Sequence, residues 1–109
     1  MKLIIAIVHD DDVRNLIDDL TREEFRVTKL ATTGGFLKAG NTTLLAGVED
    51  NRVDEAIEII KNNCETRSQT ITSPTPMAGT AGVFIPYPIE VRVGGATVFV
   101  IDIEKYMKL

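Results

Sequence analysis

Residues 32–43, with the sequence TTGGFLKAGNTT, combine side chains and backbone that could bind a small nucleotide. Glycine lets backbone N–H groups approach a ligand closely, and hydroxyls, a lysine and free amides can hold phosphate oxygens. Phe36 offers a face on which a base could stack, and Asn41 carries a donor and an acceptor for a base edge. The same glycines would suit a flexible hairpin tip. A solvated turn rarely presents two large apolar residues, so Phe36 and Leu37 favour the ligand-binding interpretation.

Three residues in the flanking segments support this interpretation. Arg26 and Thr28 are two residues apart in a strand-like segment, so both would point to one face and could reach one phosphate. Gly47 lies within the next strand-like segment, where glycine costs stability and often marks the close approach of a ligand or another backbone. On their own, Arg26 and Thr28 would indicate only an ordinary solvated strand face.

The sequence offers little for catalysis. The single histidine, His9, follows an apolar segment and precedes three aspartates, and the single cysteine, Cys64, ends a predicted helix. An exposed strand-end residue and a structural thiol are the simpler interpretations, because neither has an evident catalytic partner. No P-loop, dinucleotide fingerprint or zinc-ligand spacing occurs. We therefore expect a binding protein that uses neither a metal nor a cofactor, and not an enzyme.

Composition limits the classes of partner. The chain has 109 residues, enough for one domain over 1–109 with a single core. Its net charge of −4 argues against binding to long nucleic acid, which usually requires a basic surface. No apolar stretch approaches the ~20 residues of a membrane span, and the apolar start meets acidic residues with no cleavage site. A lone cysteine cannot form an internal disulfide, which favours a reducing cytoplasm.

Residues 2–8 are apolar on both faces, as expected of a central strand that is covered on both sides. Hydrophobic patterning also predicts strands at 25–33 and 42–48 and two helices. Asp10 or Asp11 is expected to cap the first helix, and Asp50 or Asn51 the second. Residues 7–13 align with 47–53, so a strand–helix unit is repeated with a strand between the copies. Such a repeat indicates an α+β domain with a ferredoxin-like βαββαβ order.

The last third of the sequence has a different pattern. A short strand is expected at 68–72, followed by a long loop over 73–88, which contains all four prolines. Strands at 89–93 and 96–103 would then form a C-terminal β-hairpin, with Gly94 and Gly95 as its two-residue turn. Loops of this length in compact domains are often functional.

Several contiguous motifs resemble the PII-like cyclic-di-AMP receptor family of Gram-positive bacteria. They are TKLATTGGFL at 28–37, AGNTT at 39–43, SPTPM at 73–77, IPYP at 85–88 and VGGATVFV at 93–100. The resemblance covers nearly the whole chain. It implies a PII-type homotrimer that binds one cyclic di-AMP in each cleft between subunits and catalyses no reaction. Glu24 departs from the family pattern, which often has a neutral amide at that position.

The resemblance also implies roles for individual residues. Phe36 would stack on an adenine, Asn41 and the backbone around Gly47 would read an adenine edge, and Arg26 and Thr28 would hold phosphate or sugar oxygens. Phe99 and the C-terminal tail would close the site from the neighbouring side. The implied site residues are Arg26, Thr28, Gly35, Phe36, Leu37, Asn41, Gly47 and Phe99.

The ligand is expected to order the loops at 34–41 and 65–88 and so to create a surface for an unidentified downstream target protein. Two alternatives remain open. The chain could be a PII-like regulator that binds ATP or another adenine nucleotide. It could also be a structural trimer that works without a ligand, in which case the run at 32–43 is only a turn.

Overall fold

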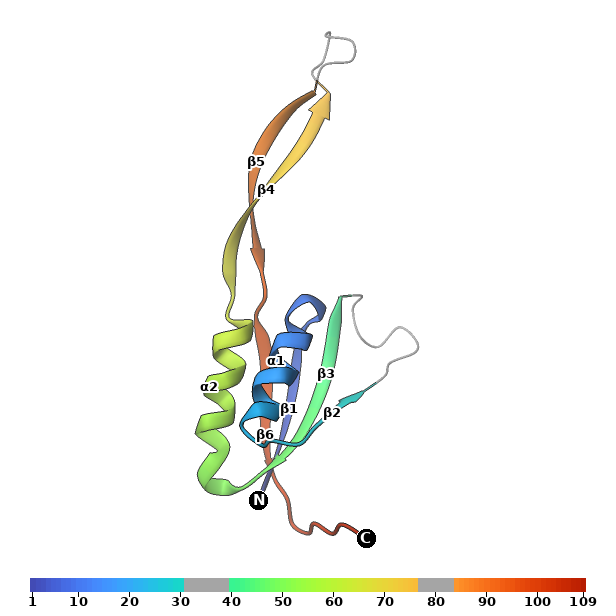
Figure 1. The fold of residues 1–109 in the computed structure, drawn as a ribbon, viewed down its shortest axis with the longest axis vertical. Coiled ribbons are helices and arrows are strands. Elements are labelled where there is room, and N and C mark those ends of the chain that lie inside the picture. Colours follow the sequence, from blue (N-terminus) through green and yellow to red (C-terminus); the bar gives the residue numbers. More distant parts are fainter. Residues whose placement is uncertain (31–39, 77–83) are drawn as a thin grey trace.

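Two strand–helix units and two further strands form the body of the molecule, from which a β-ribbon extends (Figure 1). The computed structural model describes residues 1–30, 40–76 and 84–109, with the backbone alone for 71–76 and 84–87. The elements are β1 (Lys2–His9), α1 (Asp10–Arg22), β2 (Val27–Leu30), β3 (Asn41–Val48), the 3-10 turn η1 (Asp50–Arg52), α2 (Val53–Cys64), β4 (Arg67–Pro76), β5 (Phe84–Val93) and β6 (Ala96–Asp102).

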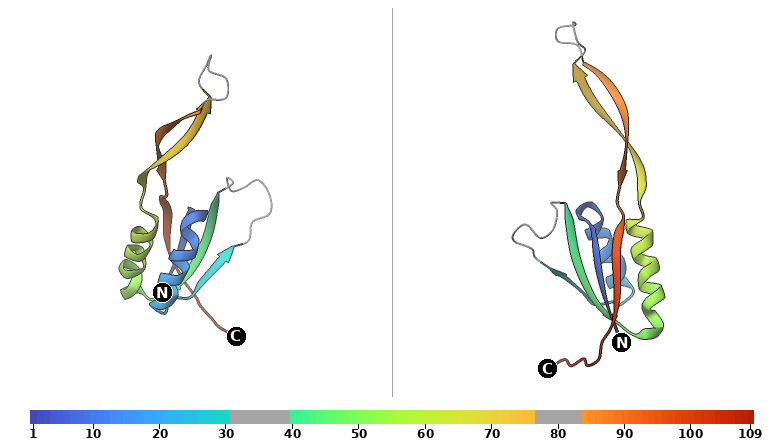
Figure 2. Two further views of the ribbon diagram at one scale, coloured as in Figure 1. Left: turned by 45° about the horizontal axis from the view of Figure 1, so that its top comes forward. Right: turned by 180° about the vertical axis from the view of Figure 1, so that it is seen from behind.

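The body is a four-stranded antiparallel sheet in the order β2-β3-β1-β6. Each strand–helix unit contributes one of the two central strands, β1 before α1 and β3 before α2. This α+β arrangement of one sheet and two helices is consistent with the ferredoxin-like fold that the sequence predicts. Seen from behind in Figure 2, both helices lie on the same side of the sheet.

The core lies between the sheet and the helices. Alternate residues of the central strands face the helices and are buried, because successive side chains of a strand point to opposite faces. Leu16 of α1 and Cys64 of α2 have no exposed surface. The apolar residues of this core are Ile4, Ala6, Val8, Val13, Leu16, Leu20, Phe25, Leu44, Ala46, Val48, Ala56, Ile60 and Cys64.

The other side of the sheet carries no helix, and we call it the open face (Figure 2). Its side chains come from the alternate strand positions and are largely apolar, yet Phe99 is 50% exposed and Ile101 is 47% exposed. Exposed apolar patches of this kind on a sheet often mark a contact with another molecule. The register of the strands assigns to the open face Leu3, Ile5, Ile7, Thr28, Leu30, Thr43, Leu45, Gly47, Thr97, Phe99 and Ile101.

Both predictions of helix caps are wrong. Helix α1 begins at Asp10 itself, after His9, and the Asp10 carboxylate accepts a hydrogen bond from the Thr42 hydroxyl on β3. Helix α2 begins at Val53, because the residues before it form η1, and Asp50 pairs with the N-terminal ammonium at 2.8 Å. The acidic groups still lie near the positive ends of the helices. Instead of forming a capping hydrogen bond within the helix, they contact residues that are distant in the sequence.

The predicted long loop over 73–88 is also wrong for most of its length. Residues 67–76 and 84–93 pair in register as a two-stranded antiparallel ribbon, with Pro74 opposite Pro86. Proline cannot donate to a β-ladder, which excludes it from central strands but not from edge strands. Each strand of a two-stranded ribbon has a free edge, so a proline whose nitrogen faces outward loses no pairing. Residues 77–83, between β4 and β5 in the sequence, lie outside the described residues.

The predicted hairpin at Gly94 and Gly95 does not form, because β5 pairs with β4 and β6 pairs with β1. Both glycines have positive φ, 80° and 95°. They carry the chain from the ribbon into the sheet where it passes close to the end of α2. A Cβ on Gly94 would lie 3.0 Å from the Glu65 carbonyl oxygen, and the Gly95 N–H donates to the Cys64 carbonyl. Positive φ and close approach both favour glycine here, although the two glycines form no hairpin turn.

An ion pair holds the root of the ribbon to the body. Arg67 at the start of β4 donates from Nη2 to Oδ1 of Asp12 on α1 at 2.8 Å, and the Asp12 side chain is only 7% exposed. Burial, and then the Asp12 charge, raises the pKa of the neighbouring Cys64 thiol to about 11. The thiol is therefore protonated near neutral pH, which agrees with a structural role and not with a nucleophile.

Candidate ligand-binding site

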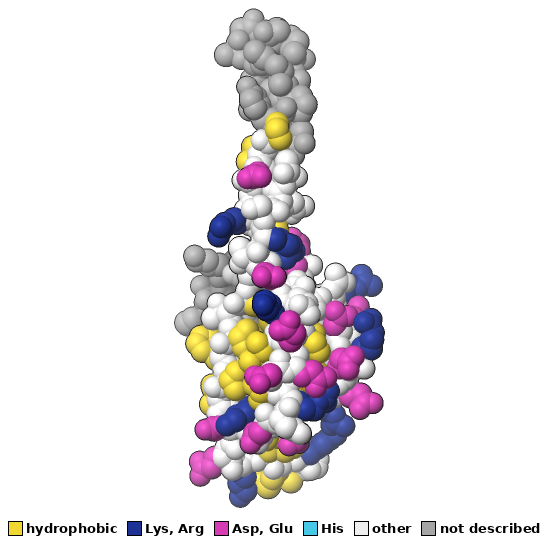
Figure 3. All heavy atoms as spheres, turned by 90° about the vertical axis from the view of Figure 1, so that its left-hand side faces the viewer, with side chains coloured by type: hydrophobic (Ala, Val, Ile, Leu, Met, Phe, Trp, Pro, Cys, Tyr) yellow, Lys and Arg dark blue, Asp and Glu magenta, His cyan; other side chains and the backbone are white. Residues whose placement is uncertain are grey.

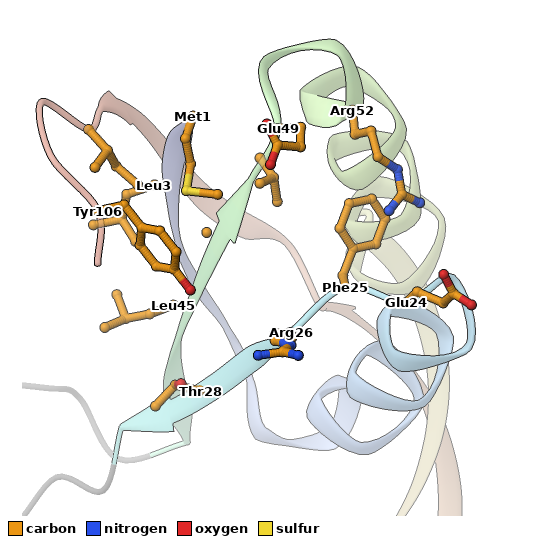
Figure 4. Close-up of a pocket in the computed structure, with 13 residues that line it drawn as sticks. Met1, Leu3, Glu24, Phe25, Arg26, Thr28, Leu45, Glu49, Arg52 and Tyr106 are labelled. Carbon is orange, nitrogen blue, oxygen red and sulfur yellow. The ribbon is translucent and has the colours of Figure 1, made fainter. Parts of the chain in front are cut away.

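A cavity of about 520 Å³ lies at one end of the open face, where β2 begins and β3 ends. Its volume falls within the range of about 300–1,000 Å³ that is usual for small-molecule sites. Leu3, Leu45 and Ile103 give it an apolar surface, and Arg26 and Thr28 add polar groups. Tyr106, from the C-terminal tail, projects into the space from the opposite side to Arg26 (Figure 4). Apolar surface beside a cation and a hydroxyl suits a flat base attached to a phosphate.

Three of the predicted site residues meet at this cavity. Arg26 and Thr28 both line it, as their period-two spacing predicts, and Gly47 lies on the strand next to them. Gly47 does not have a positive φ, and the nearest described atom to a Cβ placed there is the Met1 sulfur at 4.0 Å. Neither backbone conformation nor packing within the subunit therefore requires glycine. The missing side chain instead leaves room in the cavity.

Charge around the cavity is local and mixed. Arg26 and Arg52 are its cations, and Glu24 and Glu49 are its acids. Arg52 is engaged with Glu55 at 3.0 Å, whereas none of the ion pairs in the described part of the chain involves Arg26. Arg26 is thus the cation that is positioned to meet an anionic group of a ligand.

Glu24 has an unusual backbone conformation, with a φ of 66°. Left-handed geometry costs a residue other than glycine roughly 1–2 kcal/mol, and asparagine tolerates it better than glutamate does. Glu24 lines the cavity, but its carboxylate points away from Arg26 in Figure 4. The Glu24 carboxylate is therefore not directed at the Arg26 guanidinium.

The remaining predicted residues do not meet at the cavity. Asn41 is the first residue of β3, six positions from Gly47, which corresponds to about 20 Å along a strand. Phe99 lies on β6, and the register places it three strands from Thr28, about 14 Å across the sheet. Gly35, Phe36 and Leu37 lie outside the described residues.

Sequence analysis overlooked several residues that line the cavity. Leu45 could have been found, since it alternates with the buried residues of β3 and so shares a face with Gly47. Arg52 gave no such signal, because only the tertiary fold brings it to the cavity. The resemblance implied that the C-terminal tail closes the site of a neighbouring subunit, whereas Tyr106 of this tail lines the cavity of its own chain.

In residues 1–30, 40–76 and 84–109, no three His, Cys, Asp or Glu side chains are grouped as they would be to hold a metal ion. None of the described helices is both long enough and apolar enough to cross a membrane. Figure 3, which faces the side of the body where α2 lies, shows basic and acidic side chains interspersed and no continuous basic surface on that side.

A known sequence, a solved structure and a family model are each similar to this chain. The chain is 35% identical over 79 residues to the nitrogen fixation nifHD region GlnB-like protein 1 of Methanothermococcus thermolithotrophicus, which spans 61% of this chain and 75% of that protein. The crystal structure of a functionally unknown protein from Pediococcus pentosaceus is similar with a TM-score of 0.78 and 44% identity, over 99% of this chain and 96% of that one. A family model described as cyclic-di-AMP receptor matches residues 1–109, so the chain belongs to this family.

Proposed function

We propose that this protein is a cytoplasmic, non-catalytic receptor that binds cyclic di-AMP in clefts between the subunits of a homotrimer. The family and the GlnB-like relative support a nucleotide-binding role in signalling. The observation that carries the proposal is the cavity at the end of the open face, where Arg26, Thr28 and Gly47 meet beside apolar surface.

The spacing of the site residues supports a cleft between subunits. Within one subunit, Asn41 lies about 20 Å along β3 from Gly47, and Phe99 lies about 14 Å across the sheet from Thr28. We propose that one ligand reaches Arg26, Thr28 and Gly47 in one subunit and takes the contacts to Asn41 and Phe99 from a neighbouring subunit. The apolar open face offers the surface for such a neighbour, since trimer formation would remove it from water.

The chemical groups of cyclic di-AMP match the side chains of the proposed site. Its two phosphates carry negative charge for Arg26 and for the hydroxyl of Thr28, and an adenine could lie on the apolar surface next to Gly47. Phe36 is proposed to stack on one adenine, which contributes about 1–3 kcal/mol per base. Asn41 is proposed to read an adenine edge, where guanine would present an acceptor to the wrong partner.

The proposed relay runs from the ligand to residues 34–41 and 65–88. Cyclic di-AMP is expected to slow hydrogen exchange in both segments, because backbone amides bound by the ligand open less often. Exchange should be compared by mass spectrometry with and without ligand, using α1 as an internal reference. Unchanged exchange in both segments at saturating ligand would refute the relay.

A further inference from the structure

Arg52 lines the cavity but contacts none of the residues to which the proposed function assigns a role. Its guanidinium makes three hydrogen bonds. Nη2 donates to the carbonyl oxygen of Glu23 at 2.8 Å, and Nε and Nη2 donate to the two carboxylate oxygens of Glu55 at 3.0 and 3.1 Å. The same group lies 4.0 Å from the centre of the Phe25 ring (Figure 4). Arg52 thus connects the start of α2 to the segment that follows α1.

The segment that Arg52 holds is the turn that leads to Arg26. After α1 ends, the Glu24 N–H donates to the Thr21 carbonyl at 2.9 Å and the Phe25 N–H to the Leu20 carbonyl at 2.9 Å. Glu24 has left-handed geometry, which is a strained conformation for glutamate. Phe25 is only 5% exposed, so it anchors the turn in the core directly before Arg26.

Arg52 is itself fixed in place. The bidentate hydrogen bond with Glu55, one helical turn away, raises the pKa of Arg52 and lowers the pKa of Glu55. A planar guanidinium can bond a carboxylate with one edge and still cover an aromatic ring, which a lysine ammonium cannot do. Since Nε and Nη2 are committed to the protein, only Nη1 has no hydrogen bond among the described residues.

We propose that Arg52 is a positioning residue, which clamps the turn at 23–25 and so holds Arg26 toward the ligand. The expected effect on ligand affinity rests on the proposed function. The contact between Arg52 and the turn does not, because it is present in the protein without a ligand. Without Arg52, the strained turn would sample other conformations, and binding would have to order the turn and the Arg26 side chain.

The first test uses the unliganded protein. In Arg52→Met, hydrogen exchange of the Glu24 and Phe25 amides is expected to rise, while exchange in β1 stays unchanged. Arg22→Met is the matched control, because Arg22 also pairs with a carboxylate three residues away, Asp19 at 3.0 Å, at the exposed end of α1. Unchanged exchange at Glu24 and Phe25 in Arg52→Met would overturn the proposal whatever the ligand is.

The second test is a double-mutant cycle measured by calorimetry with cyclic di-AMP. Arg52→Met is expected to weaken binding about 3- to 10-fold, the cost of ordering a long side chain on binding. The double variant Arg26→Ala with Arg52→Met should bind no more weakly than Arg26→Ala alone, because Arg52 acts through Arg26. Arg52→Lys, which keeps the positive charge but loses the planar guanidinium that bonds Glu55 with two nitrogens, should bind as weakly as Arg52→Met.

The outcomes separate this inference from the proposed function. Multiplied losses in the double variant, or full affinity in Arg52→Lys, would show that Arg52 acts on the ligand directly and would overturn the positioning role. Full affinity in Arg26→Ala would show that the proposed site is misplaced, while the exchange measurement would still decide whether Arg52 clamps the turn.

Discussion

Replacing Arg26 by alanine is expected to weaken cyclic di-AMP binding about 10- to 100-fold. A hydrogen bond to a charged group contributes about 1.5–3 kcal/mol, and each 1.4 kcal/mol corresponds to about a tenfold change in the dissociation constant. Arg26 lines the cavity and takes part in none of the ion pairs of the described residues, so its charge is available to a phosphate. Titration calorimetry on the folded variant measures the change.

Arg22→Ala is the matched control for this prediction. It removes the same charge from the same part of the sequence, but Arg22 is at the end of α1, is exposed and does not line the cavity. We expect Arg22→Ala to bind with wild-type affinity. Equal losses in both variants would mean that Arg26 acts only through the overall charge of the protein, and no loss in Arg26→Ala would place the phosphates elsewhere.

Ile5→Asp is expected to convert the proposed trimer to monomers and to abolish ligand binding. Ile5 lies on the central strand β1, in the middle of the open face, between Leu45 and Phe99 in the register. A carboxylate buried at an apolar subunit contact loses hydration without gaining a partner, which costs several kcal/mol. In the isolated subunit the same side chain is partly exposed, so the fold should survive.

Size-exclusion chromatography with light scattering measures the mass of Ile5→Asp, and circular dichroism checks its fold. Asn62→Asp also adds a carboxylate, at an exposed position of α2 on the opposite side of the sheet from the open face, and should leave the mass unchanged. A folded trimer of Ile5→Asp would exclude the open face from the interface. Ligand binding by folded monomers would exclude a site that needs two subunits.

Hydrophobic patterning predicted the body of the fold because its helices and sheet each bury one face. The continuous apolar run before Asp10 predicts a strand, and a period of 3.6 residues predicts the helical stripe that contains Leu16; both are as expected. A period of 2 placed Arg26 and Thr28 side by side. These are local properties, so they can be read from a single sequence without knowledge of the partners.

The errors in prediction have a common physical origin: the structure of a segment also depends on which distant segments pack against it or pair with it. Prolines such as Pro74 exclude a central strand, but whether a strand has a free edge depends on what pairs with it. Gly94 and Gly95 have the positive φ of a hairpin turn, yet the end of α2 determines where the chain goes. The contact of Arg52 with the turn that precedes Arg26 could not be predicted from the sequence, because only the folded chain brings η1 next to that turn.

The most direct test of the central claim is calorimetric titration of the wild-type protein with cyclic di-AMP, and separately with cyclic di-GMP, ATP and AMP. We predict saturable binding of one cyclic di-AMP per subunit, with cyclic di-GMP at least about tenfold weaker because a mismatched base edge leaves hydrogen-bonding groups unpaired. ATP and AMP should bind more weakly still, since each carries one adenine. Absence of saturable binding with every nucleotide would favour a structural trimer, and tighter binding of ATP would indicate a different PII-like regulator. Either result would contradict the assignment of this protein as a cyclic di-AMP receptor.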